Sequence, residues 1–261
     1  MSLHSNLIYD VGASLGDDSA YYLESGYEVL AIEANPRSVA HLNTRFESEI
    51  REGRLTLVPL AIAKDEGQAV YWVCDDEPDR SSSDRSLAAE NGMRHHSIEV
   101  QTCRFATLIE KFGTPFYCKI DIEGCDGLCL RDLTSTTRPP FISAELLPGD
   151  RHIDVLRSLG YSHFKILSQR TFRPPNRTTA TWKARMPRRV SLKLTNIESR
   201  LTRYGSDGAW RFSEYSSGPF ACGTCGPWLT ADEALALQRL IERRPDGADW
   251  YDIHAALDDP N

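Results

Sequence analysis

The chain of 261 residues lacks any long hydrophobic run. No apolar stretch approaches the roughly 18 residues that a membrane-spanning helix needs, and the N-terminus has no apolar signal segment. We therefore expect no membrane partner. The sequence also lacks an excess of basic residues, because 30 Lys and Arg stand against 37 Asp and Glu for a net charge of −7. Binding to nucleic-acid phosphates needs a basic surface, so a nucleic-acid partner is not expected.

The seven cysteines are an odd number and show no disulfide framework. Three of them fall in or beside an apolar run, "YCKIDIEGCDGLCL", where a free cysteine behaves as a small hydrophobe. Together with the missing signal segment, this pattern indicates a reducing, cytoplasmic compartment. Cys222 and Cys225 form a C-x-x-C motif, but no second pair of ligands accompanies it. We expect no metal there and favour a plain loop over a metal or redox site.

Strand-like and helix-like segments alternate over about the first 165 residues, which predicts βαβ units. We expect an α/β, Rossmann-like fold with a mainly parallel central sheet and helices on both faces. Residues 1–169 form this core. Residues 170–261 form a C-terminal appendage on the same domain: a basic loop, a Gly/Pro-rich aromatic segment and a terminal helix. Thr230 and Glu233 form a capping box at the start of that helix.

The first strand–turn–strand segment is "LIYDVGASLGDDSAYYLESGYEVLAIEANP". Its turn lacks the second and third glycines of G-x-G-x-x-G, which a dinucleotide pyrophosphate needs. It has Gly12 and Gly16, preceded by Asp10, and Glu33 ends the next strand. This pattern suits S-adenosylmethionine, a nucleoside without phosphates: Asp10 would face its ammonium, and Glu33 would accept the ribose hydroxyls. Glu33 alone does not discriminate against NAD, and the glycines alone allow a tight turn without any ligand.

Several blocks, in this order and spacing, resemble the FkbM-type S-adenosylmethionine-dependent methyltransferases: the turn segment above, "PLAIAKDEGQAVYWV", "CKIDIEGCD" and "FISAEL". The resemblance implies a class I methyltransferase fold and O-methylation of a small-molecule or saccharide hydroxyl. It also implies cofactor-binding residues by position. These are Asp10, Gly12, Ala13, Ser14, Gly16, Glu33, Ala34, Asn35, Leu60, Ala61 and Asp121.

Methyl transfer to a hydroxyl needs alignment, exclusion of water and a base for the acceptor proton. The catalytic candidates at strand ends and in loops are Asp121, Glu145, His95 and His96, with Glu123 and His152 also considered. The alternative for Asp121 and Glu123 is capping of the following helix. Ser81, Ser82 and Ser83 fall in a long polar loop and are candidates for the acceptor pocket.

Three other functions stay open. The first is an NAD(P)-dependent oxidoreductase or epimerase, which the missing glycines disfavour. The second is a non-catalytic module that keeps the fold for binding. The third is a nucleic-acid methyltransferase, which the acidic charge disfavours and the Arg/Lys-rich run at 170–203 supports.

Overall fold

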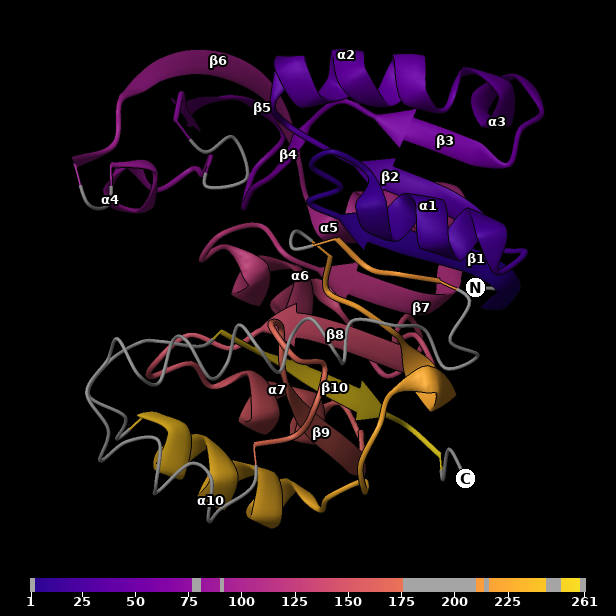
Figure 1. Ribbon diagram of the computed structural model, residues 1–261, viewed down its shortest axis with the longest axis vertical. Helices are drawn as coiled ribbons and strands as arrows, with labels where there is room; N and C mark the ends of the chain where they lie inside the picture. Colours follow the sequence, from indigo (N-terminus) through magenta and orange to yellow (C-terminus); the bar gives the residue numbers. More distant parts are fainter. Residues whose placement is uncertain are drawn as a thin grey trace. The chain divides into compact units, whose positions relative to one another are not determined.

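The computed structural model describes residues 3–76, 81–89, 92–175, 210–213, 216–242 and 250–258. The chain divides into two compact units, residues 1–140 and 141–261, whose course is shown in Figure 1. Within the described residues, every helix is too short or too polar to cross a membrane. The basic run predicted at 170–203 lies outside the described residues from position 176 onward.

The first unit is built on parallel strands in the order β3-β2-β1-β7. These strands are β1 (Leu3–Val11), β2 (Glu28–Ile32), β3 (Leu55–Val58) and β7 (Thr114–Ile120). The chain first steps outward from β1 to β3 and then returns to the other side of β1. The reversal creates a switch point between β1 and β7, where ligands bind in folds of this kind.

Helices cover both faces of this parallel sheet. The helices of the unit are α1 (Asp17–Glu24), α2 (Pro36–Arg45), α3 (Glu47–Arg51), α4 (Arg85–Ala88), α5 (Phe105–Phe112) and α6 (Asp126–Asp132). The Tyr9 hydroxyl donates to the Gly113 carbonyl at 2.7 Å, and its ring packs edge-on against Phe105 of α5. The next residue, Asp10, accepts from Ser19 of α1 at 2.6 Å. Since neighbouring strand residues point to opposite faces, α1 and α5 lie on opposite sides. The predicted α/β fold is confirmed.

A small second sheet in the same unit has the order β4-β6-β5. Its strands are β4 (Ala61–Ile62), β5 (Gly67–Cys74) and β6 (His95–Cys103). The sequence predicts a single long loop between β5 and β6. Its described part is instead partly ordered: Ser82 and Trp72 exchange backbone hydrogen bonds of 2.8 and 3.0 Å, and α4 follows.

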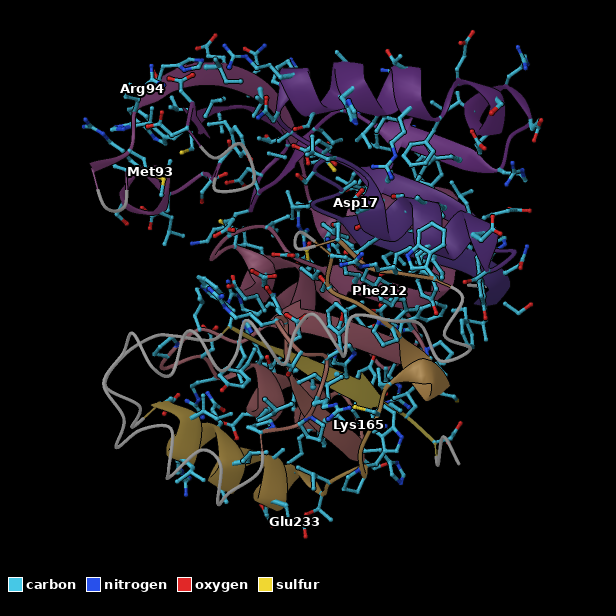
Figure 2. All side chains as sticks on the ribbon, in the orientation of Figure 1. Asp17, Met93, Arg94, Lys165, Phe212 and Glu233 are labelled. Atoms are coloured by element: carbon cyan, nitrogen blue, oxygen red, sulfur yellow. The ribbon has the colours of Figure 1, made fainter. Side chains whose placement is uncertain are left out.

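The second unit contains an antiparallel sheet in which β10 lies between β8 and β9. Its elements are β8 (Phe141–Glu145), α7 (His152–Ser158), β9 (His163–Ser168), a short 3₁₀ turn at Ala221–Gly223, α10 (Ala231–Glu242) and β10 (Tyr251–Ala256). The capping box of α10 is confirmed, because Thr230 N donates to the Glu233 carboxylate at 2.9 Å and Glu233 N donates to the Thr230 hydroxyl at 3.3 Å. Figure 2 labels Glu233 on this helix. Strand β10 was not predicted. The predicted division of the chain after residue 169 separates β9 from β10 and stays a prediction.

Candidate functional site

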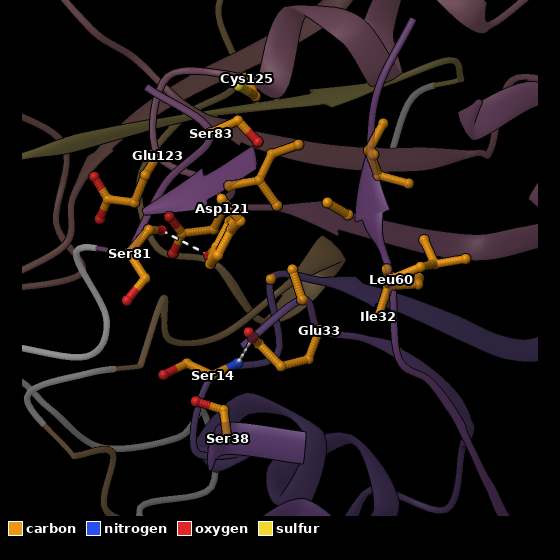
Figure 3. Close-up of a pocket in the computed structure, with 16 residues that line it drawn as sticks. Ser14, Ile32, Glu33, Ser38, Leu60, Ser81, Ser83, Asp121, Glu123 and Cys125 are labelled. Carbon is orange, nitrogen blue, oxygen red and sulfur yellow. Dashed lines mark hydrogen bonds between the residues drawn. The ribbon is translucent and has the colours of Figure 1, made fainter. Parts of the chain in front are cut away.

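A cavity opens in the first unit at the carboxyl ends of β1, β2 and β7. The empty space within it is about 550 Å³, which includes space open to solvent at its mouth. Figure 3 shows Ser14, Glu33 and Ser38 on one side of it and Ser81, Asp121 and Glu123 on another. The lining residues are Gly12, Ser14, Ile32, Glu33, Ala34, Ser38, Leu60, Ala61, Ile62, Tyr71, Ser81, Ser83, Asp121, Ile122, Glu123 and Cys125.

The turn after β1 is closed by the neighbouring strand. The N–H groups of Gly12 and Ala13 both donate to the Ile32 carbonyl, at 2.9 and 3.0 Å. Gly12 has a φ of +83°, and a Cβ there would overlap the Asp121 carbonyl oxygen. Glycine is therefore required at this position both for the left-handed backbone and for the close approach of the β7 end.

Glu33 presents a buried carboxylate to the cavity. Its Oε2 accepts from Ser14 N at 2.8 Å and its Oε1 from Asn35 N at 2.7 Å. Burial raises the pKa of this carboxyl, and the two backbone N–H groups oppose that rise. Each carboxylate oxygen has a second lone pair, so the group can still accept two hydroxyl donors. Two vicinal hydroxyls, as on a ribose, match this arrangement.

A buried ammonium lies behind the turn. Lys119 Nζ donates to the Gly12 carbonyl at 3.0 Å and contacts the carboxylates of Asp10, Asp18 and Asp121 at 3.2, 3.5 and 3.7 Å. Burial alone lowers the pKa of Lys119, but the three carboxylates together raise it well above its usual value. Lys119 therefore stays charged and ties β1, α1 and β7 together.

The structure brings seven of the predicted cofactor residues into the cavity wall and leaves four outside it. Those in the wall are Gly12, Ser14, Glu33, Ala34, Leu60, Ala61 and Asp121, and those outside are Asp10, Ala13, Gly16 and Asn35. Asp10 is fully buried against Lys119 and Ser19. A Cβ on Gly16 would collide with Phe46 of the α2–α3 junction. The Asn35 side chain caps α2 by accepting from Arg37 N at 3.0 Å.

Of the predicted bases, Asp121 lines the cavity, with 26% of its side chain exposed, and so does Glu123, which was also considered. Glu145 ends β8 in the second unit and is buried. His95 does not line the cavity. Its ring contacts other groups: Nε2 accepts from Arg85 Nε at 3.2 Å, and Nδ1 lies 3.0 Å from the Met93 carbonyl. His96 pairs with Asp75 at 3.1 Å, also outside the wall. The described residues contain no cluster of three or more His, Cys, Asp or Glu that would hold a metal ion.

Six wall residues were not proposed from the sequence: Ile32, Ser38, Ile62, Tyr71, Ile122 and Cys125. Tyr71 lies on β5, and its hydroxyl donates to the Ser81 carbonyl at 2.8 Å. The run AVYWVC in β5 is apolar throughout, so it does not mark Tyr71 as an inward residue, and the pairing with Ser81 gives no local signal. The structure also places Ser81 and Ser83 in the wall, while Ser82 lies behind it.

A family model described as "Methyltransferase FkbM domain" matches residues 10–163, which is more than half of the chain. No curated protein matches the chain.

Three solved structures illustrate the structural likeness. Methyltransferase FkbM from Methylobacillus flagellatus KT is 18% identical, with a TM-score of 0.39 over 64% of this chain and 40% of that one. The chain thus spans less than half the length of that relative. Precorrin-6y C5,15-methyltransferase from Geobacter metallireducens GS-15 is 12% identical (TM-score 0.36, 67% and 74% covered). A Burkholderia thailandensis N1-methyltransferase, with bound 1,6-didemethyltoxoflavin and S-adenosylhomocysteine, is 15% identical (TM-score 0.32, 63% and 64% covered).

Proposed function

The chain belongs to the FkbM methyltransferase family, and we propose that it transfers a methyl group from S-adenosylmethionine to a hydroxyl of a small molecule or saccharide. The observation that carries this proposal is the position of the buried Glu33 carboxylate in a cavity at the β1/β7 switch point. The turn beside it lacks the glycines that a pyrophosphate requires.

The wall residues fit this cofactor. Glu33 has the acceptor lone pairs for two ribose hydroxyls. Ile32, Leu60 and Ile62 offer apolar surface for a purine ring. The N–H groups of Gly12, Ala13 and Ser14 already donate within the protein, so the methionine carboxylate would need other donors near the α1 N-terminus. Asp10 would act on the methionine end through Lys119 and the Gly12 carbonyl.

The bound cofactor would supply an electrophilic methyl group on a sulfonium, with a neutral thioether as the leaving group. The chain's contribution is to align the acceptor, exclude water and accept the acceptor proton. We assign the acceptor proton to the Asp121 carboxylate, because this side chain lines the cavity where β7 ends and is 26% exposed.

The test is thermal unfolding with S-adenosylmethionine, S-adenosylhomocysteine and NAD in parallel. A ligand at a hundred times its Kd stabilises by about 2.7 kcal/mol. We expect stabilisation by both adenosyl compounds and none by NAD. Glu33→Ala should weaken the adenosyl effect, while Glu47→Ala, an exposed glutamate on α3, should keep it.

Two of the rival functions predict a different result in this test. Stabilisation by NAD alone would establish the oxidoreductase or epimerase. Binding of S-adenosylmethionine without transfer of a labelled methyl group to any hydroxylated acceptor would favour the non-catalytic module.

A further inference from the structure

The exposed cysteines of the chain are Cys222 and Cys225, which lie three positions apart in the second unit. The other five are buried or partly buried: Cys74, Cys103, Cys118, Cys125 and Cys129. Burial raises the pKa of the Cys103 thiol to about 11, and it also raises the pKa values of Cys118 and Cys129. Buried thiols of this kind are inert, so reaction with a reagent in solution is expected at the exposed pair.

The turn that carries this pair is ordered and fixed to β9. Within it, the Thr224 hydroxyl donates to the Ala221 carbonyl at 2.7 Å. Just after it, Leu229 and Phe164 of β9 exchange backbone hydrogen bonds of 2.7 and 2.9 Å. The sequence favoured a plain loop for the C-x-x-C motif, and the motif does lie between regular elements. Its turn is nevertheless held in place, so the two cysteines are presented together.

A buried lysine lies behind the turn. Lys165 of β9 is 4% exposed, and its Nζ donates to the carbonyl and the hydroxyl of Thr224, at 2.9 and 3.0 Å (Lys165 is labelled in Figure 2). The same Nζ lies 4.4 Å from the centre of the Trp228 ring. Burial lowers the pKa of Lys165, and the nearby Cys225 and Cys222 oppose that fall. A lysine beside the thiols is a recurring feature of reactive cysteine sites.

The two cysteines have different surroundings. The Cys225 Sγ donates to the Phe172 carbonyl at 3.0 Å, a hydrogen bond that only the protonated thiol can make. Partial burial raises the pKa of Cys225, and the charges of Arg173 and Lys165 oppose that rise. Cys222 lies within the 3₁₀ turn and is exposed. Cys225 therefore suits the second step of an exchange reaction, in which a thiol reacts only after its neighbour has formed a disulfide.

We propose that Cys222 and Cys225 form a thiol–disulfide exchange site for low-molecular-weight disulfides of the glutathione type, with Cys222 as the attacking cysteine and Cys225 as the resolving one. The proposal is independent of the proposed methyltransferase function, because the pair lies outside the residues that line the cavity.

The exchange proceeds in two steps through a mixed disulfide. The Cys222 thiolate attacks one sulfur of glutathione disulfide, the bond between its two sulfurs breaks, and one glutathione leaves as a thiolate. Cys225 then loses its proton to solvent, and its thiolate attacks the Cys222 sulfur of the mixed disulfide. The second glutathione leaves, and the Cys222–Cys225 disulfide forms. Two electrons pass from the cysteine pair to glutathione disulfide, and the two glutathione thiolates take up protons from solvent.

The test is exchange of the fully reduced, full-length chain with glutathione disulfide, followed by alkylation of the remaining thiols and peptide mass spectrometry. We expect an internal Cys222–Cys225 disulfide in the wild type. Cys225→Ser should stop the reaction at a glutathione adduct on Cys222. Cys222→Ser should react with glutathione disulfide about tenfold or more slowly than Cys225→Ser does. Cys103→Ala removes a buried thiol instead and, as the matched control, should still form the internal disulfide.

A second measurement needs no variant and decides the matter if a serine variant does not fold. Limiting iodoacetamide should alkylate Cys222 of the wild type about tenfold or more faster than Cys225. The absence of the internal disulfide, disulfide-linked dimers in its place, or faster reaction at Cys225 would overturn the proposal. Stoichiometric zinc that is released when the two thiols are alkylated would instead show that they are metal ligands, and this result would overturn it as well.

Discussion

At the scale of single residues, the candidate site depends on groups that are buried at a cost and held by several partners. Lys119 is the clearest case, because its ammonium is surrounded by three carboxylates and a carbonyl and is almost inaccessible to water. Removing one member of such a cluster leaves an uncompensated buried charge, which is strongly destabilising. The cluster therefore holds the shape of the turn on which Gly12 lies.

Gly12→Ala should destabilise the protein more than Gly26→Ala does. Both glycines have left-handed backbones, with φ of +83° and +86°, so alanine pays a similar conformational cost of about 1–2 kcal/mol at each. Only at Gly12 does the added Cβ collide with the Asp121 backbone, while nothing lies within 4 Å at Gly26. We expect an additional loss of about 1–3 kcal/mol or more at Gly12, measured by urea unfolding. Equal losses at the two positions would show that the close approach to β7 has no energetic weight.

At the scale of elements, strand β10 organises the second unit. It pairs antiparallel with β8 on one side and β9 on the other. Its middle residue, His254, is buried opposite Ser143 of β8 and Lys165 of β9. Burial, and then the Lys165 charge, lower the pKa of His254 to about 3.

This shift predicts a specific loss of stability in acid. The unfolded chain protonates His254 near pH 6.5, whereas the folded chain does so only near pH 3. As the pH falls through this window the unfolded state binds the proton first, so the free energy of unfolding decreases, by on the order of a few kcal/mol. His254→Gln should flatten the pH dependence between 6.5 and 3 in urea unfolding, and His41→Gln, an exposed histidine on α2, should not. A wild-type slope in His254→Gln would contradict a buried neutral imidazole.

At the scale of the whole molecule, the antiparallel sheet of the second unit depends on β10, which comes late in the sequence. Strands β8 and β9 precede β10 in sequence by more than 80 residues, yet each pairs with β10 along most of its length. Both β8 and β9 therefore lack hydrogen-bond partners for part of their backbone until β10 has paired with them.

Truncation should therefore act in an all-or-none way on this unit. A chain ending at residue 249 lacks β10, and we expect amide hydrogen exchange to lose its protection in β9 and at those amides of β8 that pair with β10. A chain ending at Asp258 keeps β10 whole and should retain that protection. Retained protection in the shorter chain would mean that β8 and β9 are stable without the strand between them.

The amino-acid sequence by itself determined the features that depend on local pattern. The apolar runs of β1, β2 and β7 are short and bounded by turn signals, which is enough to predict buried parallel strands. The capping box at Thr230 is likewise local, since its two partners are three residues apart. The order of Gly12 and Glu33 along one βαβ unit located the cavity, because the ends of adjacent parallel strands meet at one edge.

Only the tertiary structure decided which distant residues meet. Asp10 is paired with Lys119, more than 100 positions away, and is directed into the protein interior where the sequence suggested a cofactor contact. Ser82 meets Glu123, and β10 enters between two much earlier strands. Such contacts depend on how the sheet orders its strands and how a loop packs. Neither the strand order nor the loop packing produces a periodic pattern in the residues concerned. The local sequence therefore does not predict these contacts.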